Sequence, residues 1–516
     1  MNRHPLSLQQ FTAKFAILLV CSCSVLRGLS QQQYYVDAVT GDDSKSGRSP
    51  SLAWRSLTNI NGRRFNPGDQ ILLRAGEMWT GSIRPKGSGS SESPIILSSW
   101  GNGAKPVVQG NGDDSTILLS EISYWTIRNI AVTNHGPRPD RRNGIMLHVS
   151  TSGLVSGIHI VDVDVSDVNG DVESKSSGGI GVYGFSKEGR PARFDDILID
   201  HCTVEHVDGQ GIWFELKGSA SPRDPRWNEF HNSNIRITGS TIVDTGRNAI
   251  FLRYTQGPQI DHNVIRYASA RHHGNAVVLV ATKDAVIHDN EVSNTGENQG
   301  EGENGAFDAD DGAVGTIIED NWSHNNAGGM ANVVNDPSKG VPNDGTIIRY
   351  NLSENDRARI FGIGGTVTNT LIHNNTIFIG KGLSPHIVEA GRYVEHKPGD
   401  PDGLLFFNNI VFSEGGGGYS LQATHVAFDS NCIFGKHVSG ERGDKHQVIA
   451  DPGFDRKLIP IQSWQQMSAY RISSDSACAQ PGASNVDRSG RDILGTALST
   501  SAPLLYRGAV APTGKQ

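Results

Sequence analysis

Asp308, Asp310 and Asp311 make an acidic segment at a place where neighbouring repeats of the chain carry apolar residues. If Phe307 and Ala309 point inward along a strand, Asp308 and Asp310 share the outer face, about 7 Å apart. Repulsion between two carboxylates raises the pKa of one of them, which suits a general acid beside a base or nucleophile. We therefore predict catalytic roles for these three aspartates.

Two other interpretations of this segment stay open. Asp310–Gly312 has the composition of an ordinary turn, and aspartate-rich turns also bind Ca²⁺ through oxygen ligands. The predicted strand register is a second open point, because aligning Gly305 one residue differently turns Phe307 outward and both aspartates inward.

Neighbouring repeats supply residue types that recognise sugars. The candidates for substrate binding are Trp213, Glu215, Arg247, Arg253, Arg271, His272, Trp322 and Arg357. Arginines suit a carboxylate-bearing sugar and tryptophans suit stacking on a sugar ring, while His273 is a candidate base. Each also has a structural interpretation, namely solvated turns for the histidines, scattered surface charge for the arginines and core packing for the tryptophans.

A short phrase repeats along the chain and must position these side chains. It reads Ile-x-x-Asn followed by a β-branched residue, with an interval of roughly 23 to 39 residues. The phrases are centred on Cys202, Asn263, Asn290, Asn321, Asn351, Asn375 and Asn408. We expect each asparagine to sit at a tight bend in left-handed backbone geometry and to pass side-chain hydrogen bonds along a ladder.

Short strands separated by Gly and Asn, without helical periodicity, favour an all-β coil over alternating strands and helices. We predict a single-domain parallel β-helix solenoid of about eleven or more coils. The expected divisions are an N-terminal cap with first coils at 31–110, repeats at 111–440 and a C-terminal capping segment at 441–516.

Composition excludes several classes of protein. The 516 residues include 61 glycines without a collagen period, and the formal net charge of −8 does not fit a basic nucleic-acid binder. Residues 1–30 have the basic start and short apolar run of a signal peptide, so we expect a secreted or periplasmic protein. No segment is long enough to predict a membrane span. Of the five cysteines, Cys202, Cys432 and Cys478 follow the leader, and we expect them to be buried apolar residues.

The sequence resembles the right-handed parallel β-helix proteins of the pectate-lyase-like superfamily. The similar segments are Tyr34–Asp37, Gly41–Gly47, Ala53–Leu57, Pro67–Leu73, Lys105–Val108, Ser476–Gly482 and Tyr506–Ala509. This resemblance implies the fold, and it adds weight to the Phe-Asp-x-Asp segment because secreted members carry a similar one. The superfamily contains lyases, hydrolases, epimerases and non-catalytic adhesins, so it does not imply one activity. The arginine motif of pectate lyases and the motifs of polygalacturonases are missing from this sequence.

We predict a polysaccharide-degrading enzyme, with glycoside hydrolysis by the aspartate pair as the first hypothesis. One alternative is a lyase or epimerase acting on a uronate, and another is a non-catalytic carbohydrate-binding protein. The expected partner is a polysaccharide, with no nucleic acid, no cofactor and no required metal, although Ca²⁺ remains an alternative at the acidic segment.

Overall fold

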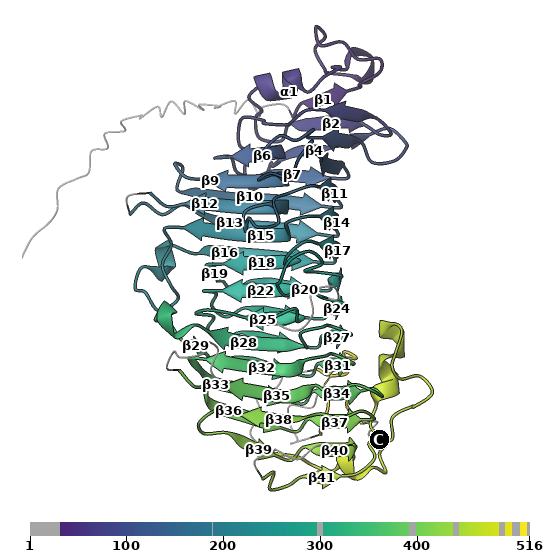
Figure 1. Ribbon diagram of the computed structural model, residues 1–516. Helices are drawn as coiled ribbons and strands as arrows, with labels where there is room; N and C mark the ends of the chain where they lie inside the picture. The colour runs from purple at the N-terminus through teal and green to yellow at the C-terminus, as the bar shows by residue number, and fades with distance from the viewer. Residues whose placement is uncertain are drawn as a thin grey trace, which may run out of the picture. The chain divides into compact units, whose positions relative to one another are not determined.

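The computed structural model describes residues 31–187, 189–296, 303–391, 399–436, 443–483, 491–497 and 506–512. The predicted signal peptide at 1–30 lies outside the described residues. Within the described residues, the strands form three parallel sheets of 16, 14 and 11 strands, which Figure 1 shows stacked coil upon coil. Each coil adds one strand to each sheet in turn. The predicted all-β parallel β-helix is confirmed.

The first sheet begins each coil. Its strands are β1 Gln33–Val36, β2 Gln70–Arg74, β4 Ile95–Trp100, β7 Trp125–Arg128, β10 Leu154–Val161, β13 Arg193–Asp200, β16 Asn232–Thr238, β19 Thr255–Gln256, β20 Gln259–Asp261, β23 Val286–His288, β26 Ile317–Glu319, β29 Asn343–Asp344, β30 Ile347–Arg349, β33 Val367–His373, β36 Asp402–Phe407 and β39 Ala427–Asp429.

The second sheet follows the bend at which the repeated asparagines lie. Its strands are β3 Met78–Thr80, β5 Val107–Gln109, β8 Ala131–Asn134, β11 Asp164–Val168, β14 Thr203–Val207, β17 Thr241–Thr245, β21 Val264–Arg266, β24 Glu291–Ser293, β27 Trp322–His324, β31 Leu352–Glu354, β34 Thr376–Ile379, β37 Ile410–Ser413, β40 Cys432–Gly435 and β41 Val448–Ile449.

The third sheet carries the acidic segment. Its strands are β6 Ser115–Ser120, β9 Asn143–Val149, β12 Gly178–Phe185, β15 Gln210–Lys217, β18 Ile250–Arg253, β22 Val277–Val280, β25 Phe307–Ala309, β28 Ala331–Asn335, β32 Arg359–Gly365, β35 His386–Gly391 and β38 Gly418–Leu421. The described residues also form short helices, which are η1 Pro50–Leu52, α1 Thr58–Gly62, η2 Trp227–Glu229, η3 Pro337–Lys339, η4 Trp464–Tyr470 and η5 Ala477–Ala479.

The isoleucine of the repeated phrase fills the core. Parallel pairing places these residues directly above one another, so that Ile260, Ile287 and Ile318 are aligned in successive coils. All three are fully buried, and the column continues in both directions along the first sheet. Removing such side chains from water is the main source of stability in a fold of short strands, at about 1.5–3 kcal/mol for each large aliphatic residue.

The asparagine of the phrase makes a continuous hydrogen-bond ladder. The Oδ1 atom of Asn321 accepts hydrogen bonds from the backbone N–H and the side-chain amide of Asn290, at 3.0 and 2.9 Å. The Oδ1 atom of Asn351 accepts the same two bonds from Asn321, both at 3.0 Å. The ladder runs through Asn263, Asn290, Asn321, Asn351, Asn375, Asn409 and Asn431 and ends on Asp444.

Two details of the sequence prediction are corrected at this bend. The left-handed residue is the one before each ladder asparagine, for example Asp289 and Asp320 with φ near 55°, and not the asparagine itself. The last predicted phrase is also displaced by one residue, because Asn409 makes the ladder bonds while Asn408 has the left-handed conformation. Aspartate and asparagine tolerate this backbone region better than other residues with a Cβ atom.

The C-terminal segment packs on the outer face of the second sheet. Trp322 of β27 and Phe412 of β37 belong to the same buried cluster as Tyr470 of η4. A disulfide joins Cys432 of β40 to Cys478 of η5, across 46 residues. The prediction that these two cysteines are only small buried residues is therefore wrong, whereas Cys202 is free and buried as expected. Sequence spacing could not show the pairing because it depends on where the segment docks.

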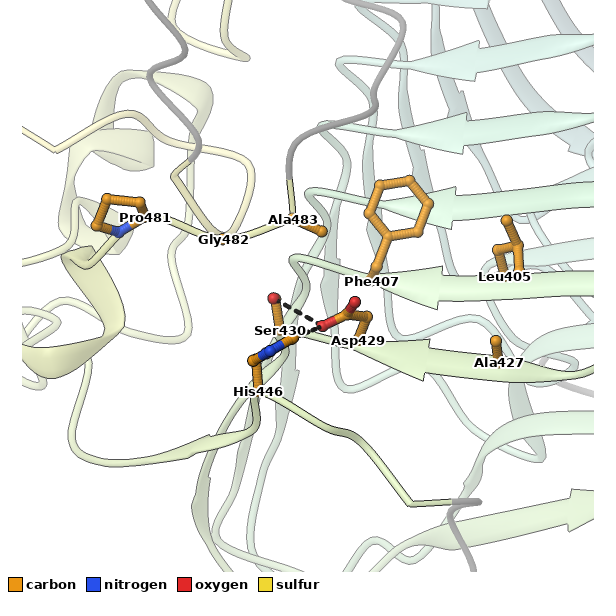
Figure 2. A pocket seen from close by; sticks show the side chains of 9 residues that line it. All are labelled: Leu405, Phe407, Ala427, Asp429, Ser430, His446, Pro481, Gly482 and Ala483. Carbon is orange, nitrogen blue, oxygen red and sulfur yellow. Dashed lines mark hydrogen bonds and ion pairs between the residues drawn. The ribbon is translucent and has the colours of Figure 1, made fainter.

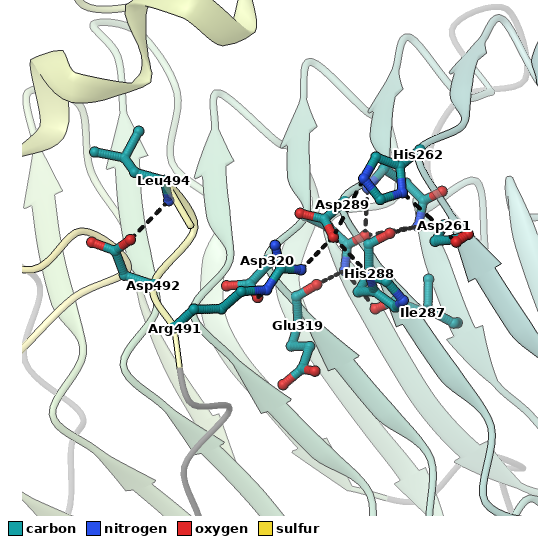
Figure 3. A network of polar contacts seen from close by, with 12 residues as sticks. Asp261, His262, Ile287, His288, Asp289, Glu319, Asp320, Arg491, Asp492 and Leu494 are labelled. Atoms are coloured by element: carbon teal, nitrogen blue, oxygen red, sulfur yellow. Dashed lines mark hydrogen bonds and ion pairs between the residues drawn. The ribbon is translucent and has the colours of Figure 1, made fainter. Parts of the chain in front are cut away.

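Asp320 lies at the bend between the first and second sheets, where Arg491 of the C-terminal segment reaches it (Figure 3). The Nε atom of Arg491 is 3.6 Å from Asp320 Oδ2, and the same guanidinium bonds Asp289. Asp320 is fully buried, and neither of its oxygens accepts a hydrogen bond from the part of the chain that the structure describes. Burial, together with the negative charge of Glu319, raises the pKa of Asp320 to about 8 despite the arginine.

We predict that Asp320→Asn stabilises the protein at alkaline pH. A carboxyl group whose pKa is raised in the folded state binds its proton more tightly there, so stability falls as the pH rises from about 4 to 8. A shift of this size corresponds to an upper bound on the order of 5 kcal/mol. Thermal unfolding should give the variant a higher melting temperature than the wild type at pH 9 and a smaller difference at pH 5. A constant difference across this range would contradict the assignment.

Candidate functional site

The acidic segment lies on the outer face of the third sheet, as the alternation predicts. Phe307 and Ala309 of β25 are fully buried in the main core. Asp308, between them, is aligned with Val278 of β22 and Asn332 of β28 on the opposite face. The alternative register, with both aspartates inward, is therefore wrong.

Asp308 is held by one amide, which a chain of hydrogen bonds connects to the next coils. Its Oδ2 atom accepts a hydrogen bond from the Asn275 side-chain N–H at 2.7 Å. The Oδ1 atom of Asn275 in turn accepts from the Gly305 backbone N–H at 2.7 Å and from the Asn332 amide at 3.3 Å. Arg359 donates to Asn332 Oδ1 from the far side at 3.3 Å. The other oxygen of Asp308, Oδ1, is buried and has no hydrogen-bond partner among the described residues.

Both aspartates of the pair have raised pKa values. Asp308 is only 4% exposed, and burial followed by the negative charges of Asp310 and Glu303 raises its pKa well above the usual range. Burial, and then the charge of Asp311, raises the pKa of Asp310 to about 7. The Asp311 N–H and the ammonium of Lys175 act in the opposite direction on Asp310. A coupled pair near neutral pH keeps one carboxyl protonated and leaves the other ionisable.

Asp311 has a structural position in the turn that follows β25. Its Oδ1 atom accepts the Asp336 backbone N–H at 2.7 Å, and the next residue, Gly312, donates its N–H to Asn335 at 2.8 Å. These bonds fix the turn against the next coil. The catalytic role predicted for Asp311 stays a prediction.

Positive side chains surround the aspartate pair at the level of the preceding coils. Arg253 of β18 forms an ion pair with Glu215 of β15 at 2.9 Å, so two predicted substrate-binding residues bind each other. Arg247 is 7% exposed and donates to the backbone oxygen of Val172 at 3.0 Å. Lys175 is an exposed residue, yet partial desolvation by the surrounding protein lowers its pKa. The charges of Arg253 and Arg247 lower this pKa further, and the charge of Asp310 acts in the opposite direction.

Sequence reasoning missed Lys175, Asn275, Asn332 and Glu303 as members of this site. Asn332 could have been found by aligning the third strands of successive repeats, since it occupies the position beside Asp308. Asn275 precedes β22 and is outside that strand alignment. Lys175 belongs to the connection between β11 and β12, which has no repeat to align with. Arg359 rather than Arg357 is the arginine of β32 that reaches the site.

The two predicted tryptophans are packing residues. Trp213 is 1% exposed in a cluster with Phe251 and Val278, and its indole N–H donates to Asn143 at 3.0 Å. Trp322 belongs to the second sheet, is also 1% exposed, and donates to Glu354 at 2.8 Å. Neither ring has a face exposed to solvent for stacking on a sugar, which corrects the prediction.

The remaining predicted residues lie apart from the aspartate pair. Arg271 is bound to Asp208 and Asp244 at 3.0 and 2.7 Å. His272 bonds the backbone oxygen of His273 at 2.9 Å, and His273 is exposed. Among the described residues neither imidazole contacts Asp308 or Asp310, so the role of His273 as a base and that of His272 in binding stay predictions. Arg357 lines a separate cavity that is described below.

Another cavity, of about 530 Å³, lies beside the last coils of the first sheet (Figure 2). Its lining residues are Leu405, Phe407, Ala427, Asp429, Ser430, His446, Pro481, Gly482 and Ala483. Asp429 accepts bonds from both His446, at 2.7 Å, and Ser430, at 2.9 Å. Because the serine bonds the aspartate and not the histidine, the three residues do not form a nucleophile activated by a base.

The comparisons with known proteins fit this geometry. No family model matches the chain. A lacto-N-biosidase of Bifidobacterium longum subsp. longum is 26% identical over 439 residues, covering 67% of this chain and 27% of that protein. The chain thus spans about a quarter of the length of the curated relative it matches.

Among solved structures, a GH136 lacto-N-biosidase from Eubacterium ramulus has a TM-score of 0.63 and 22% identity, covering 77% of this chain and 68% of that one. An alginate lyase in complex with G6 has a TM-score of 0.51 and 11% identity, covering 82% and 88% of the two chains. These likenesses agree with the parallel β-helix fold that the three sheets form.

The described residues contain no helix long and apolar enough to cross a membrane. They also contain no group of three or more His, Cys, Asp or Glu side chains arranged to hold a metal ion. The expectation of activity without a cofactor stays a prediction, as does the calcium alternative.

We predict that Lys175 reacts with amine reagents at lower pH than other lysines, because only the neutral amine is nucleophilic. Competitive acetylation followed by mass spectrometry measures this, with exposed Lys45 as the reference. Arg253→Gln removes a nearby positive charge and should raise the labelling pH of Lys175 alone. If both lysines are labelled at the same pH, the pKa of Lys175 is not lowered by its surroundings and the prediction is wrong.

Proposed function

We propose that this protein is a secreted glycoside hydrolase that uses Asp308 and Asp310 as its carboxylate pair. The observation that carries the proposal is the pair of Asp308, which is buried, and Asp310, which is partly exposed, both with raised pKa values. The match to a lacto-N-biosidase supports hydrolysis over other activities of the fold. The predicted leader and the Cys432–Cys478 disulfide support an oxidising compartment outside the cytoplasm.

The hydrogen bonds support different roles for the two aspartates in this proposal. Asp308 has the more buried carboxyl, and its Oδ2 accepts from Asn275, so a proton on this group belongs on Oδ1. From that atom it can be donated to the glycosidic oxygen as the leaving group departs. Asp310, with a pKa of about 7, is the group that ionises and acts as nucleophile or as base toward water.

The matched lacto-N-biosidase also suggests a substrate to test. We propose a glycan that ends in lacto-N-biose as the first substrate to test, because the name of the matched enzyme refers to that disaccharide. The polysaccharide expected from the sequence is the broader class to which such a glycan belongs.

A uronate lyase is the second candidate, and Lys175 is the observation that favours it. A lysine with a lowered pKa beside arginines can abstract the proton next to a carboxylate that the arginines neutralise. A lyase forms an unsaturated sugar that absorbs ultraviolet light, whereas a hydrolase forms only new reducing ends. Ultraviolet absorbance without sugar release by hydrolysis would replace the first proposal with this one.

We expect Asp308→Asn and Asp310→Asn each to lower kcat by at least about 100-fold, the contribution typical of a positioned acid or base. Release of lacto-N-biose, followed by chromatography, is the measurement. Asp475→Asn, a change at an exposed aspartate of the C-terminal segment, is the matched control and should keep full activity. Unchanged melting temperatures of the site variants would show that catalysis, and not the folded state, has been lost. Full activity in both site variants would refute the assignment.

The pH dependence should respond to Glu303, whose charge raises the pKa of both aspartates. Activity requires an ionised Asp310 and a protonated Asp308, so kcat/KM should rise with pH through about 7 and fall at higher pH. Glu303→Gln should move the acidic limb to lower pH by roughly half a unit. Glu92→Gln, a change at an exposed residue, should move neither limb. If Glu303→Gln leaves the pH of the acidic limb unchanged, Asp310 is excluded as the ionising group.

A further inference from the structure

A cavity of about 550 Å³ lies where coils pass from the second to the third sheet, beginning one coil beyond Asp308. Its walls come from four successive coils and from the C-terminal segment. The lining residues are Asn325, Asn355, Arg357, Phe378, Gly380, Lys381, Leu383, Glu414, Arg456, Ile459 and Pro460.

The charges in this cavity are unbalanced. Arg456 is neutralised by Asp451, and its guanidinium lies 5.3 Å from the centre of the Phe412 ring. Arg357 and Lys381 have no ion-pair or hydrogen-bond partner for their charged groups among the described residues. Glu414 is the acidic residue of the lining. An excess of positive charge on a chain of net charge −8 marks this place as one suited to an anion.

The fold fixes the asparagines of the cavity in positions where their side-chain amides can still donate hydrogen bonds. Asn325 and Asn355 occupy the same corner of consecutive coils, and both have left-handed backbones, with φ of 59° and 56°. The Oδ1 atom of Asn355 accepts a hydrogen bond from the Gly380 N–H at 2.9 Å. The NH₂ group of the same side chain can therefore donate to a ligand. Neighbouring Leu383, partly buried, adds apolar surface.

We propose that this cavity binds a sugar unit that carries a carboxylate or sulfate group. Arg357 and Lys381 would bind the anionic group, the asparagines would bond hydroxyls, and the apolar wall would cover the C–H face of the ring. A cavity of about 550 Å³ is large enough for a short saccharide. The site is separate from the aspartate pair and does not require the proposed hydrolysis.

Binding to the whole protein tests the proposal, with calorimetry as the readout. The probes are trigalacturonate, a sulfated disaccharide, a neutral galactose trimer and inorganic sulfate. We expect saturable binding of at least one acidic saccharide, weakening at high salt, and at least tenfold weaker binding of the neutral trimer. Arg357→Ala and Lys381→Ala should each weaken acidic saccharide binding at least fivefold.

Arg138→Ala is the control because Arg138 is exposed in a distant connection of the chain. It should leave binding unchanged, and Lys381→Arg should retain most of the affinity. Binding of inorganic sulfate as tight as that of the saccharides would overturn the sugar assignment. Acidic saccharide binding that survives both alanine variants, or is absent from the wild type, would overturn the site. Asp308→Asn should bind these probes normally, so failure of hydrolysis and failure of this site are distinguishable.

Discussion

The asparagine ladder at the first bend is the interaction on which the rest of the molecule depends. From Asn290 to Asn431, the Oδ1 atom of each ladder asparagine accepts two bonds from the asparagine of the preceding coil, so the coils of this stretch are held at one register. Leaving one buried amide without a partner costs about 1–3 kcal/mol, which penalises a slip of the chain. Since a shift of one residue exchanges the two faces of a strand, the same ladder keeps Asp308 outside the core.

The parallel register also produces the electrostatics of the aspartate site. Residues aligned with Asp308 in the adjacent coils are Val278 and Asn332, which are both uncharged, and its hydrogen bond comes from another amide, that of Asn275. A cation bound directly to Asp308 would stabilise the carboxylate and lower its pKa. Burial and the charges of Asp310 and Glu303 instead raise the pKa of Asp308.

The sequence was sufficient for interactions that recur along the chain, and it failed where distant segments meet. The repeated isoleucine and asparagine predicted the β-helix, and alternation at Phe307 predicted which way Asp308 points. The pair Asn408 and Asn409 offered two equivalent registers, which only the stacking of coils decides. Alternation indicates the face that Trp213 occupies, but not what covers that face. The docking of the C-terminal segment, and with it the Cys432–Cys478 disulfide, has no local signal.

Two buried carboxylates, Glu354 and Asp308, differ in how fully the fold satisfies their oxygen atoms. Glu354 is 1% exposed and accepts hydrogen bonds from Trp322, Tyr470 and the Ile461 N–H, which occupy both of its oxygens. Asp308 is buried to a similar degree, yet it has one donor, and its Oδ1 atom has none. Folding gains little from a carboxyl group left in that state, because an unpaired buried oxygen destabilises the protein. On the proposed function, a bound glycosidic oxygen that accepts the Asp308 proton would supply the partner that the described residues do not provide.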